Sequence, residues 1–196
     1  MKEFWESKFK EVKDAWGVEP AEAAYFALDF FRFKQLKKIL MPGCGYGRNA
    51  KLFSDHGFEV TGIEISEFAV ELAKKTLAPS VKIHVGSVND MPFDEEVYDG
   101  IFSYALLHLL NEEQRLKFIE NCMKQLKSGG YLIFSVLSKS SPMYGQGMII
   151  DKDFYEISPG LNVFFYDKYS VKREFQDFGL VECFELDEPI KFNKDE

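Results

Sequence analysis

The spacing of apolar residues along this chain changes between the period of a helix and that of a strand. Residues 20–36 place apolar side chains on one face of an amphipathic helix, and Lys38–Met41 is a short apolar strand. Strand-like and helix-like segments then alternate. The pattern predicts strands over 58–65, 81–85, 99–104 and 131–137, with helices over 48–56, 67–77 and 111–126 between them.

Capping and breaking residues stand at the ends of these elements. Gly57 follows the first of the three helices, Ser66 stands at the N-cap of the second, and Ser128–Gly130 separates the third from the next strand. Strands joined by such helices imply parallel crossovers buried on both faces of a sheet. We therefore expect an α/β fold: a doubly wound, Rossmann-like, mostly parallel sheet of about six to seven strands with helices on both faces.

The pattern loosens after Leu137. Residues 138–162 contain Ser, Pro, Gly and aromatic residues without a clear period. A last crossover helix is predicted over 167–178, ended by Gly179. A strand over 180–186 and a short partner strand over 189–192 are predicted to follow.

Length and charge narrow the classes of partner. The 196 residues suffice for one domain with its own core. The 24 Lys and Arg residues against 32 Asp and Glu give a formal charge of −8, which disfavours nucleic acid and anionic lipid. The three cysteines form no CxxC pair, so the sequence excludes a disulfide framework or a zinc knuckle and suits a reducing compartment.

Neither an export signal nor a membrane span is evident. Met1–Glu6 carries charge where a signal peptide needs an apolar core. The longest mostly apolar run, Ile101–Leu110, has about half the length needed to cross a bilayer. We expect a soluble, cytoplasmic monomer or homodimer with no membrane or nucleic-acid partner.

The most informative stretch is a glycine-rich turn between a predicted strand and a predicted helix. It contains Gly43, Gly45 and Gly47. Glycines let a ligand approach the backbone closely, and the helix N-terminus offers free N–H groups. Glu64 lies 17 residues further on, at the end of the second strand. In a doubly wound sheet this carboxylate faces the turn across a crevice, where it can accept both hydroxyls of a ribose.

The glycine spacing distinguishes two classes of nucleotide cofactor. Dinucleotide enzymes use G-x-G-x-x-G, whereas here the third glycine comes one place early and Arg48 stands in its position. The G-x-G-x-G turn followed by Glu64 resembles class I S-adenosylmethionine-dependent methyltransferases. Three further segments resemble that family in the same order: Val85–Phe93, Tyr98–Tyr104 and Leu126–Tyr131. The resemblance implies S-adenosylmethionine as the cofactor and S-adenosylhomocysteine as its product.

The sequence and the resemblance together give a set of candidate site residues, and no metal is expected. Tyr104 and His108 are the catalytic candidates, although Tyr104 is alternatively a wall of the cofactor site or a core tyrosine, and His108 a structural histidine. Trp16 either covers the cofactor or docks the N-terminal helix. The implied cofactor-binding residues are Trp16, Gly43, Cys44, Gly45, Glu64, Ile65, Ser87, Val88 and Tyr104.

Two positions depart from the family pattern. Met41 stands where the family usually has an acidic residue that helps to hold the methionine ammonium. Ser87 stands where it often has Asp for the adenine amine. We expect carbonyl groups near Gly43 and an acidic residue of the N-terminal segment, Glu19, to hold the methionine ammonium in place of the acidic residue missing at position 41.

These assignments divide one methyltransferase domain, 1–196, into four parts. They are an N-terminal cap segment (1–36), a cofactor-binding core (37–137), an acceptor-side flap (138–166) and a C-terminal helix with strands (167–196). Phe154, Phe165 and Tyr166 are expected to line an apolar acceptor pocket.

The expected function is methyl transfer to a small-molecule acceptor by in-line displacement in a water-excluding cleft. The Pro42–Ala50 loop and Trp16–Gly17 look more loosely like the tellurite-resistance and thiopurine S-methyltransferase branch, which implies a thiol or a chalcogen or metalloid oxyanion as acceptor. Two alternatives stay open: a nucleotide-dependent oxidoreductase, and a non-catalytic S-adenosylmethionine-binding regulatory protein.

Overall fold

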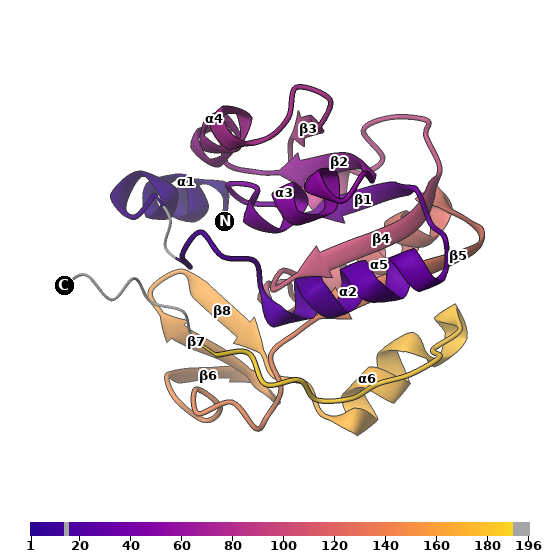
Figure 1. Cartoon of the computed structure of the whole chain (residues 1–196). Coiled ribbons are helices and arrows are strands. Elements are labelled where there is room, and N and C mark those ends of the chain that lie inside the picture. Colours follow the sequence, from indigo (N-terminus) through magenta and orange to yellow (C-terminus); the bar gives the residue numbers. More distant parts are fainter. Residues whose placement is uncertain (14–15, 190–196) are drawn as a thin grey trace.

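The computed structural model describes residues 1–13 and 16–189 (Figure 1). Two helices, α1 (Lys2–Glu11) and α2 (Glu22–Phe33), precede a five-stranded parallel sheet. The strand order is β3-β2-β1-β4-β5, so the order reverses between β1 and β4. Ligands of such sheets bind outside the carboxyl ends of the strands at this reversal. The strands are β1 (Lys38–Pro42), β2 (Glu59–Glu64), β3 (Lys82–Val85), β4 (Tyr98–Tyr104) and β5 (Leu126–Ser135).

Capping residues fix where the connecting helices begin. The Ser66 hydroxyl accepts a hydrogen bond from the Ala69 N–H, 3.1 Å away, at the start of α4. Asn111 and Gln114 form a reciprocal capping box at the start of α5. The helices after β1 are α3 (Arg48–Asp55), α4 (Glu67–Thr76), α5 (Glu112–Gln125) and α6 (Lys168–Phe175), with short 3₁₀ turns at Val88–Asp90, Leu107–Leu109 and Gln176–Phe178.

Helices cover both faces of the parallel sheet, as Figure 1 shows. On one face, Phe31 of α2 and Phe53 of α3 pack in a chain of aromatic rings with Phe102 of β4. On the other face, Phe118 of α5 packs in a second buried cluster that includes Ile101 of β4. The expected α/β class with a mostly parallel sheet covered on both faces is therefore confirmed.

The expected number of strands is wrong for the described part of the chain. The parallel sheet has five strands there rather than six or seven, and β5 is its last strand. Residues 180–186, predicted as a strand, form no strand. The predicted strand over 189–192 lies, after Pro189, outside the described residues.

Side-chain contacts with α2 and with the segment after β5 explain why residues 180–189 do not pair with β5. The Phe184 ring packs edge-on against Phe26, with centroids 4.9 Å apart. The Glu188 carboxylate accepts hydrogen bonds from the first-turn amides of α2, Glu22 N–H at 2.9 Å and Ala23 N–H at 3.2 Å. Ser140 donates to Glu185 at 2.8 Å. These contacts hold the segment between α2 and the loop after β5.

A small antiparallel sheet occupies most of the segment in which the sequence showed no period. Its strands are β6 (Met148–Asp151), β7 (Phe154–Ser158) and β8 (Leu161–Phe164), in the order β6-β7-β8. The turn between β6 and β7 places Asp153 at φ 60°, which a short polar residue tolerates. Among the described residues, no helix has the length and apolar content of a membrane span.

Candidate functional site

The glycine turn joins β1 to α3 with its three glycines in left-handed conformation. The φ angles of Gly43, Gly45 and Gly47 are +72°, +56° and +87°. A Cβ on Gly43 would lie 2.9 Å from Leu106 Cδ2, so that position is packed closely. A Cβ on Gly45 would meet only Phe9 Cζ, at 3.7 Å, so the middle of the turn leaves room beside the backbone.

Glu64, at the end of β2, faces this turn as the sequence predicts. Its side chain is buried, with one carboxylate oxygen accepting from the Gly45 N–H and the other from the Ser66 N–H, both at 2.9 Å. Burial raises the pKa of this carboxyl, and hydrogen bonds from the N–H groups of Ser66, Gly45 and Ile65 oppose the rise. The turn and the carboxylate thus form one hydrogen-bonded unit.

The segment around residues 16–19 is fastened to the glycine turn by side chains of the turn itself. The Tyr46 hydroxyl donates to the Gly17 carbonyl at 2.6 Å. Arg48 Nη1 donates to the carbonyls of Trp16 (2.7 Å) and Glu19 (2.9 Å). The carboxylate of Glu19 does not line the cavity described below; its side chain is exposed. The expectation that Glu19 replaces the missing acidic residue at position 41 is therefore wrong.

Helix α1, which the sequence analysis missed, packs over the same turn. Phe9 is its one buried residue, and the Phe9 ring contacts the rings of Trp5, Trp16 and Tyr46 with centroids about 6 Å apart (6.0, 5.8 and 6.1 Å). The signal was present in the sequence as the i, i+4 pair of Trp5 and Phe9. This helix places aromatic side chains beside Gly45.

A carboxylate of α1 ties this helix to α4. Glu6 accepts from the Ser66 hydroxyl at 2.7 Å and from the Phe68 N–H at 3.3 Å, and the hydrogen bond from Ser66 is the largest cause that lowers the pKa of Glu6 to about 2. Lys2 pairs with Glu67 at 2.8 Å, with both side chains more than half exposed (55% and 65%).

Tyr104 ends β4 near groups of opposite charge. The pKa of this tyrosine is raised to about 12. Burial is the largest cause of the rise and the nearby Glu188 carboxylate the second, so the hydroxyl stays protonated near neutral pH. The Arg48 guanidinium lies 5.5 Å from the centre of its ring. The Tyr104 side chain is therefore neutral and lies near both a cation and an anion.

His108 is a buried, neutral imidazole. Its Nδ1 accepts a hydrogen bond from the Leu137 N–H, 3.2 Å away. Burial lowers the pKa of His108 to about 3. Because the lone pair of Nδ1 is occupied, the ring proton lies on Nε2, and that atom donates rather than accepts. Of the two alternatives, this geometry favours the structural histidine over the base.

A continuous cavity of about 1210 Å³ connects these elements. All ten residues predicted for the site line it. They are Trp16, Gly43, Cys44, Gly45, Glu64, Ile65, Ser87, Val88, Tyr104 and His108.

The cavity continues from the glycine turn towards the small sheet. Of the three aromatic residues expected there, only Tyr166 lines it, and Phe165 is fully buried in a core cluster. Apolar residues of the predicted acceptor-side flap (138–166) line this part of the cavity, together with two residues that the sequence did not single out, Leu109 and Leu137. The flap residues are Met143, Ile157, Leu161 and Val163. Among the described residues, no group of three or more His, Cys, Asp or Glu side chains is placed to hold a metal ion.

Residues 40–134 match a protein family described as "Methyltransferase domain". The chain is similar to a ubiquinone biosynthesis O-methyltransferase of Coxiella burnetii, 29% identical over 111 residues that make up 55% of this chain and 47% of the relative. It is also similar to sarcosine/dimethylglycine N-methyltransferase of Aphanothece halophytica, 33% identical over 105 residues (50% and 37%). The chain spans about half the length, or less, of these curated relatives.

Solved structures share the fold at low sequence identity. One is the Burkholderia thailandensis 1,6-didemethyltoxoflavin-N1-methyltransferase with bound 1,6-didemethyltoxoflavin and S-adenosylhomocysteine (TM-score 0.70, 18% identity, covering 90% of this chain and 74% of that one). Another is an S-adenosylmethionine-dependent methyltransferase from Clostridium acetobutylicum (TM-score 0.64, 13% identity, covering 78% and 77%). At these identities the likeness concerns the fold.

Proposed function

We propose that this chain is a class I methyltransferase that binds S-adenosylmethionine and transfers its methyl group to a small-molecule acceptor, a proposal supported by the match of residues 40–134 to the methyltransferase-domain family. The observation that carries the proposal is the buried Glu64 carboxylate bonded to the Gly45 N–H across the cleft. A tight strand-to-helix turn alone requires no such buried carboxylate.

The residues of the cleft fit an adenosyl cofactor. The Glu64 oxygens accept backbone hydrogen bonds from Gly45 and Ser66, and a carboxylate has about four lone-pair sites, so acceptor capacity remains for a ribose hydroxyl. The open side of Gly45 admits a ligand close to the backbone. The cavity exceeds the range of about 300–1,000 Å³ that is usual for one small ligand, so a cofactor and an acceptor fit together.

The two ends of the cleft suit the two ends of the cofactor. Ser87 and Val88, at the carboxyl end of β3, would hold the adenine. Arg48 and Glu188, both near Tyr104, would complement the carboxylate and ammonium of the methionine end. In this assignment Glu188 takes the place of the acidic residue that is missing at Met41, which is buried in the core.

S-adenosylmethionine supplies a methyl group on a sulfonium, which leaves as a neutral thioether when the acceptor attacks. The protein aligns the two molecules, and such alignment can supply about 7–11 kcal/mol of the barrier. Trp5 and Phe9 of α1, together with Trp16 of the following segment, exclude water from the cleft, and their ring faces also favour a cation. Tyr104 is a wall of the site.

His108 is then a structural histidine: its Nε2 carries the ring proton and its Nδ1 is occupied by the Leu137 N–H, so it does not remove a proton from the acceptor. Since neither catalytic candidate is a base, the acceptor is one that attacks as an anion, such as a thiolate or a chalcogen oxyanion. The apolar wall from the small sheet accommodates the rest of the acceptor.

A thermal-shift titration tests the cofactor, with S-adenosylmethionine, S-adenosylhomocysteine and NADH as ligands. At a hundred times the dissociation constant, a true ligand adds about 2.7 kcal/mol to the free energy of unfolding. We expect shifts with the first two and none with NADH. A shift with NADH alone would instead support the oxidoreductase alternative.

An acceptor screen tests the reaction by following release of S-adenosylhomocysteine. The screen contains thiols, metalloid oxyanions, phenols and small amines. Turnover with a thiol or an oxyanion would support the proposed acceptor class. Turnover with a phenol or an amine alone would show that the acceptor belongs to that class instead. Cofactor binding without turnover on any acceptor would support the regulatory alternative.

A further inference from the structure

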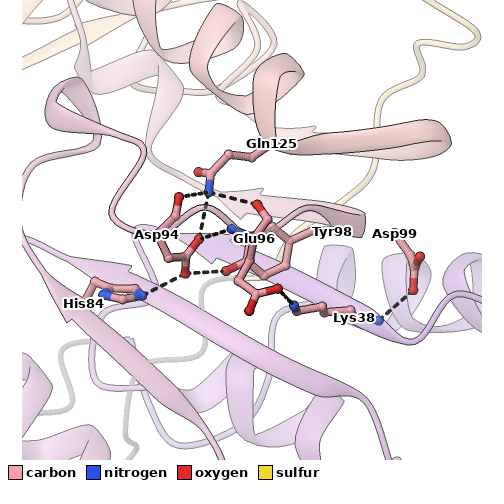
Figure 2. Close-up of polar contacts among 7 residues, drawn as sticks. All are labelled: Lys38, His84, Asp94, Glu96, Tyr98, Asp99 and Gln125. Carbon is pink, nitrogen blue, oxygen red and sulfur yellow. Dashed lines mark hydrogen bonds and ion pairs between the residues drawn. The ribbon is translucent and has the colours of Figure 1, made fainter.

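The loop between β3 and β4 connects the cleft to a polar cluster outside it. The loop begins at Gly86 and carries Ser87 and Val88 onto the cavity wall. It then returns through Phe93 and Asp94 to β4 at Tyr98. Figure 2 shows the cluster at the return, where Asp94 lies among His84, Tyr98 and Gln125. Of the residues in this cluster, none lines the cavity.

The return of the loop packs directly on its beginning. A Cβ on Gly86 would lie 2.3 Å from Phe93 Cζ, so the Phe93 ring covers the backbone of Gly86. The His84 imidazole stacks on this ring, with centroids 5.8 Å apart and an angle of 15°. The position of Phe93 therefore sets how Gly86 and Ser87 enter the cleft.

Asp94, next to Phe93, fixes the return with four hydrogen bonds to its carboxylate. One oxygen accepts from His84 Nε2 at 3.0 Å and from the Tyr98 hydroxyl at 2.8 Å. The other accepts from Gln125 Nε2 at 3.0 Å and from the Glu96 N–H at 3.2 Å. The donors come from β3, from β4, from α5 and from the loop itself (Figure 2).

This arrangement suits a carboxylate at position 94. All four partners donate to it, and Tyr98 and Gln125 are buried, so water does not replace a lost acceptor easily. Burial alone would raise the pKa of Asp94, but hydrogen bonds from Tyr98, Glu96 and His84 lower it overall. An amide at position 94 would turn an NH₂ group towards two donors.

We propose that Asp94 is a positioning residue for the adenine end of the cleft, acting through Phe93 and Gly86 on Ser87 and Val88. The inference rests on the proposed function, since it assumes that this end holds adenine. This inference predicts that Asp94 controls the affinity for the adenine of the cofactor and not for its amino-acid end.

Asp94→Asn is the test variant and Asp99→Asn its matched control. Asp99 is also a carboxylate with a lowered pKa, but its Oδ2 accepts from the N–H groups of Lys37 and of Lys38, at the start of β1, rather than from the β3–β4 loop. Figure 2 shows its contact with Lys38. The probes are S-adenosylhomocysteine, adenosine, and S-ribosylhomocysteine, which is S-adenosylhomocysteine without its adenine. Calorimetry measures the dissociation constant of each probe.

We expect Asp94→Asn to weaken the binding of S-adenosylhomocysteine and of adenosine by about tenfold, and the binding of S-ribosylhomocysteine by less than about twofold. Asp99→Asn should leave the ratio between the probes unchanged. Tyr98→Phe, which removes one of the four donors and keeps the ring, should give the same selectivity with a smaller loss. In turnover, Asp94→Asn should raise KM for S-adenosylmethionine and leave kcat unchanged.

Equal losses for all three probes, or the same selectivity in Asp99→Asn, would overturn the inference. If Asp94→Asn does not fold, Tyr98→Phe decides, and an unchanged probe ratio in that variant overturns the inference as well. A wild-type protein that binds no S-adenosylhomocysteine would refute the proposed function instead, so the two failures are distinguishable.

Discussion

Phe9→Ala tests whether helix α1 covers the cofactor cleft. Phe9 is 4% exposed and is the one buried residue of this helix. Replacing a buried Phe with Ala costs about 3–5 kcal/mol. The ion pair between Lys2 and Glu67 is exposed, and such pairs contribute about 0–1 kcal/mol. Glu6 also holds α1 through its hydrogen bonds with Ser66 and Phe68, but Phe9 is the one buried side chain of this helix, so its loss should loosen α1 while the two cores of the sheet stay folded.

Hydrogen exchange and calorimetry measure the two consequences. We expect the amides of α1 to lose protection in Phe9→Ala, and S-adenosylmethionine to bind about tenfold or more weakly because water enters the cleft. Phe33→Ala is the matched control, since this ring is 79% exposed and lies at the end of α2. Unchanged protection of α1, or an unchanged cofactor affinity despite its release, would refute the reasoning.

Three further predictions concern pH, the C-terminal segment and the glycine turn. The pKa of Glu64 is raised in the free protein and should fall when ribose hydroxyls donate to the carboxylate, so cofactor binding should release a proton. The affinity for the cofactor should therefore weaken as pH falls through that raised pKa, by at most about tenfold per pH unit. Calorimetry in two buffers that finds no proton release on binding would contradict this. Glu188→Ala removes the acceptor from two amides of α2 and should lower the free energy of unfolding in urea by about 1 kcal/mol, whereas an unchanged midpoint would show that this contact does not hold the segment. Gly47→Ala should destabilise the protein more than Gly57→Ala. Both glycines have a positive φ, but only a Cβ at position 47 would meet a neighbour, Leu77 Cδ1 at 2.9 Å. Equal urea midpoints of the two variants would contradict this.

The sequence predicted the parallel sheet and its crossover helices because periodicity and caps agree there. Ser66 and Asn111 begin α4 and α5 as expected, and Gly57 follows α3. The small antiparallel sheet was missed because its strands have four or five residues, and β6 exposes its apolar side chains rather than alternating them. The strand predicted over 180–186 has a suitable pattern, but pairing needs a neighbour, and long-range contacts of Glu188 and Phe184 hold the segment elsewhere.

The site could be predicted only where motif and topology coincide. The carboxyl ends of parallel strands meet at one edge, so the topology alone brought Gly45, Glu64, Ser87 and Tyr104 to one cavity. The partners of Glu19 and Phe9 depend on how the N-terminal segment packs across the sheet. No local pattern encodes that packing, which is why the first residue was assigned wrongly and the second was missed.

The most direct measurement of the central claim is a calorimetric titration of S-adenosylmethionine into the wild-type chain and into Glu64→Ala. Glu64 links the cleft to the glycine turn, so the account predicts one binding site per chain and a markedly weaker interaction in the variant. A wild-type titration without heat at several temperatures, or equal affinities for the two proteins, would contradict it.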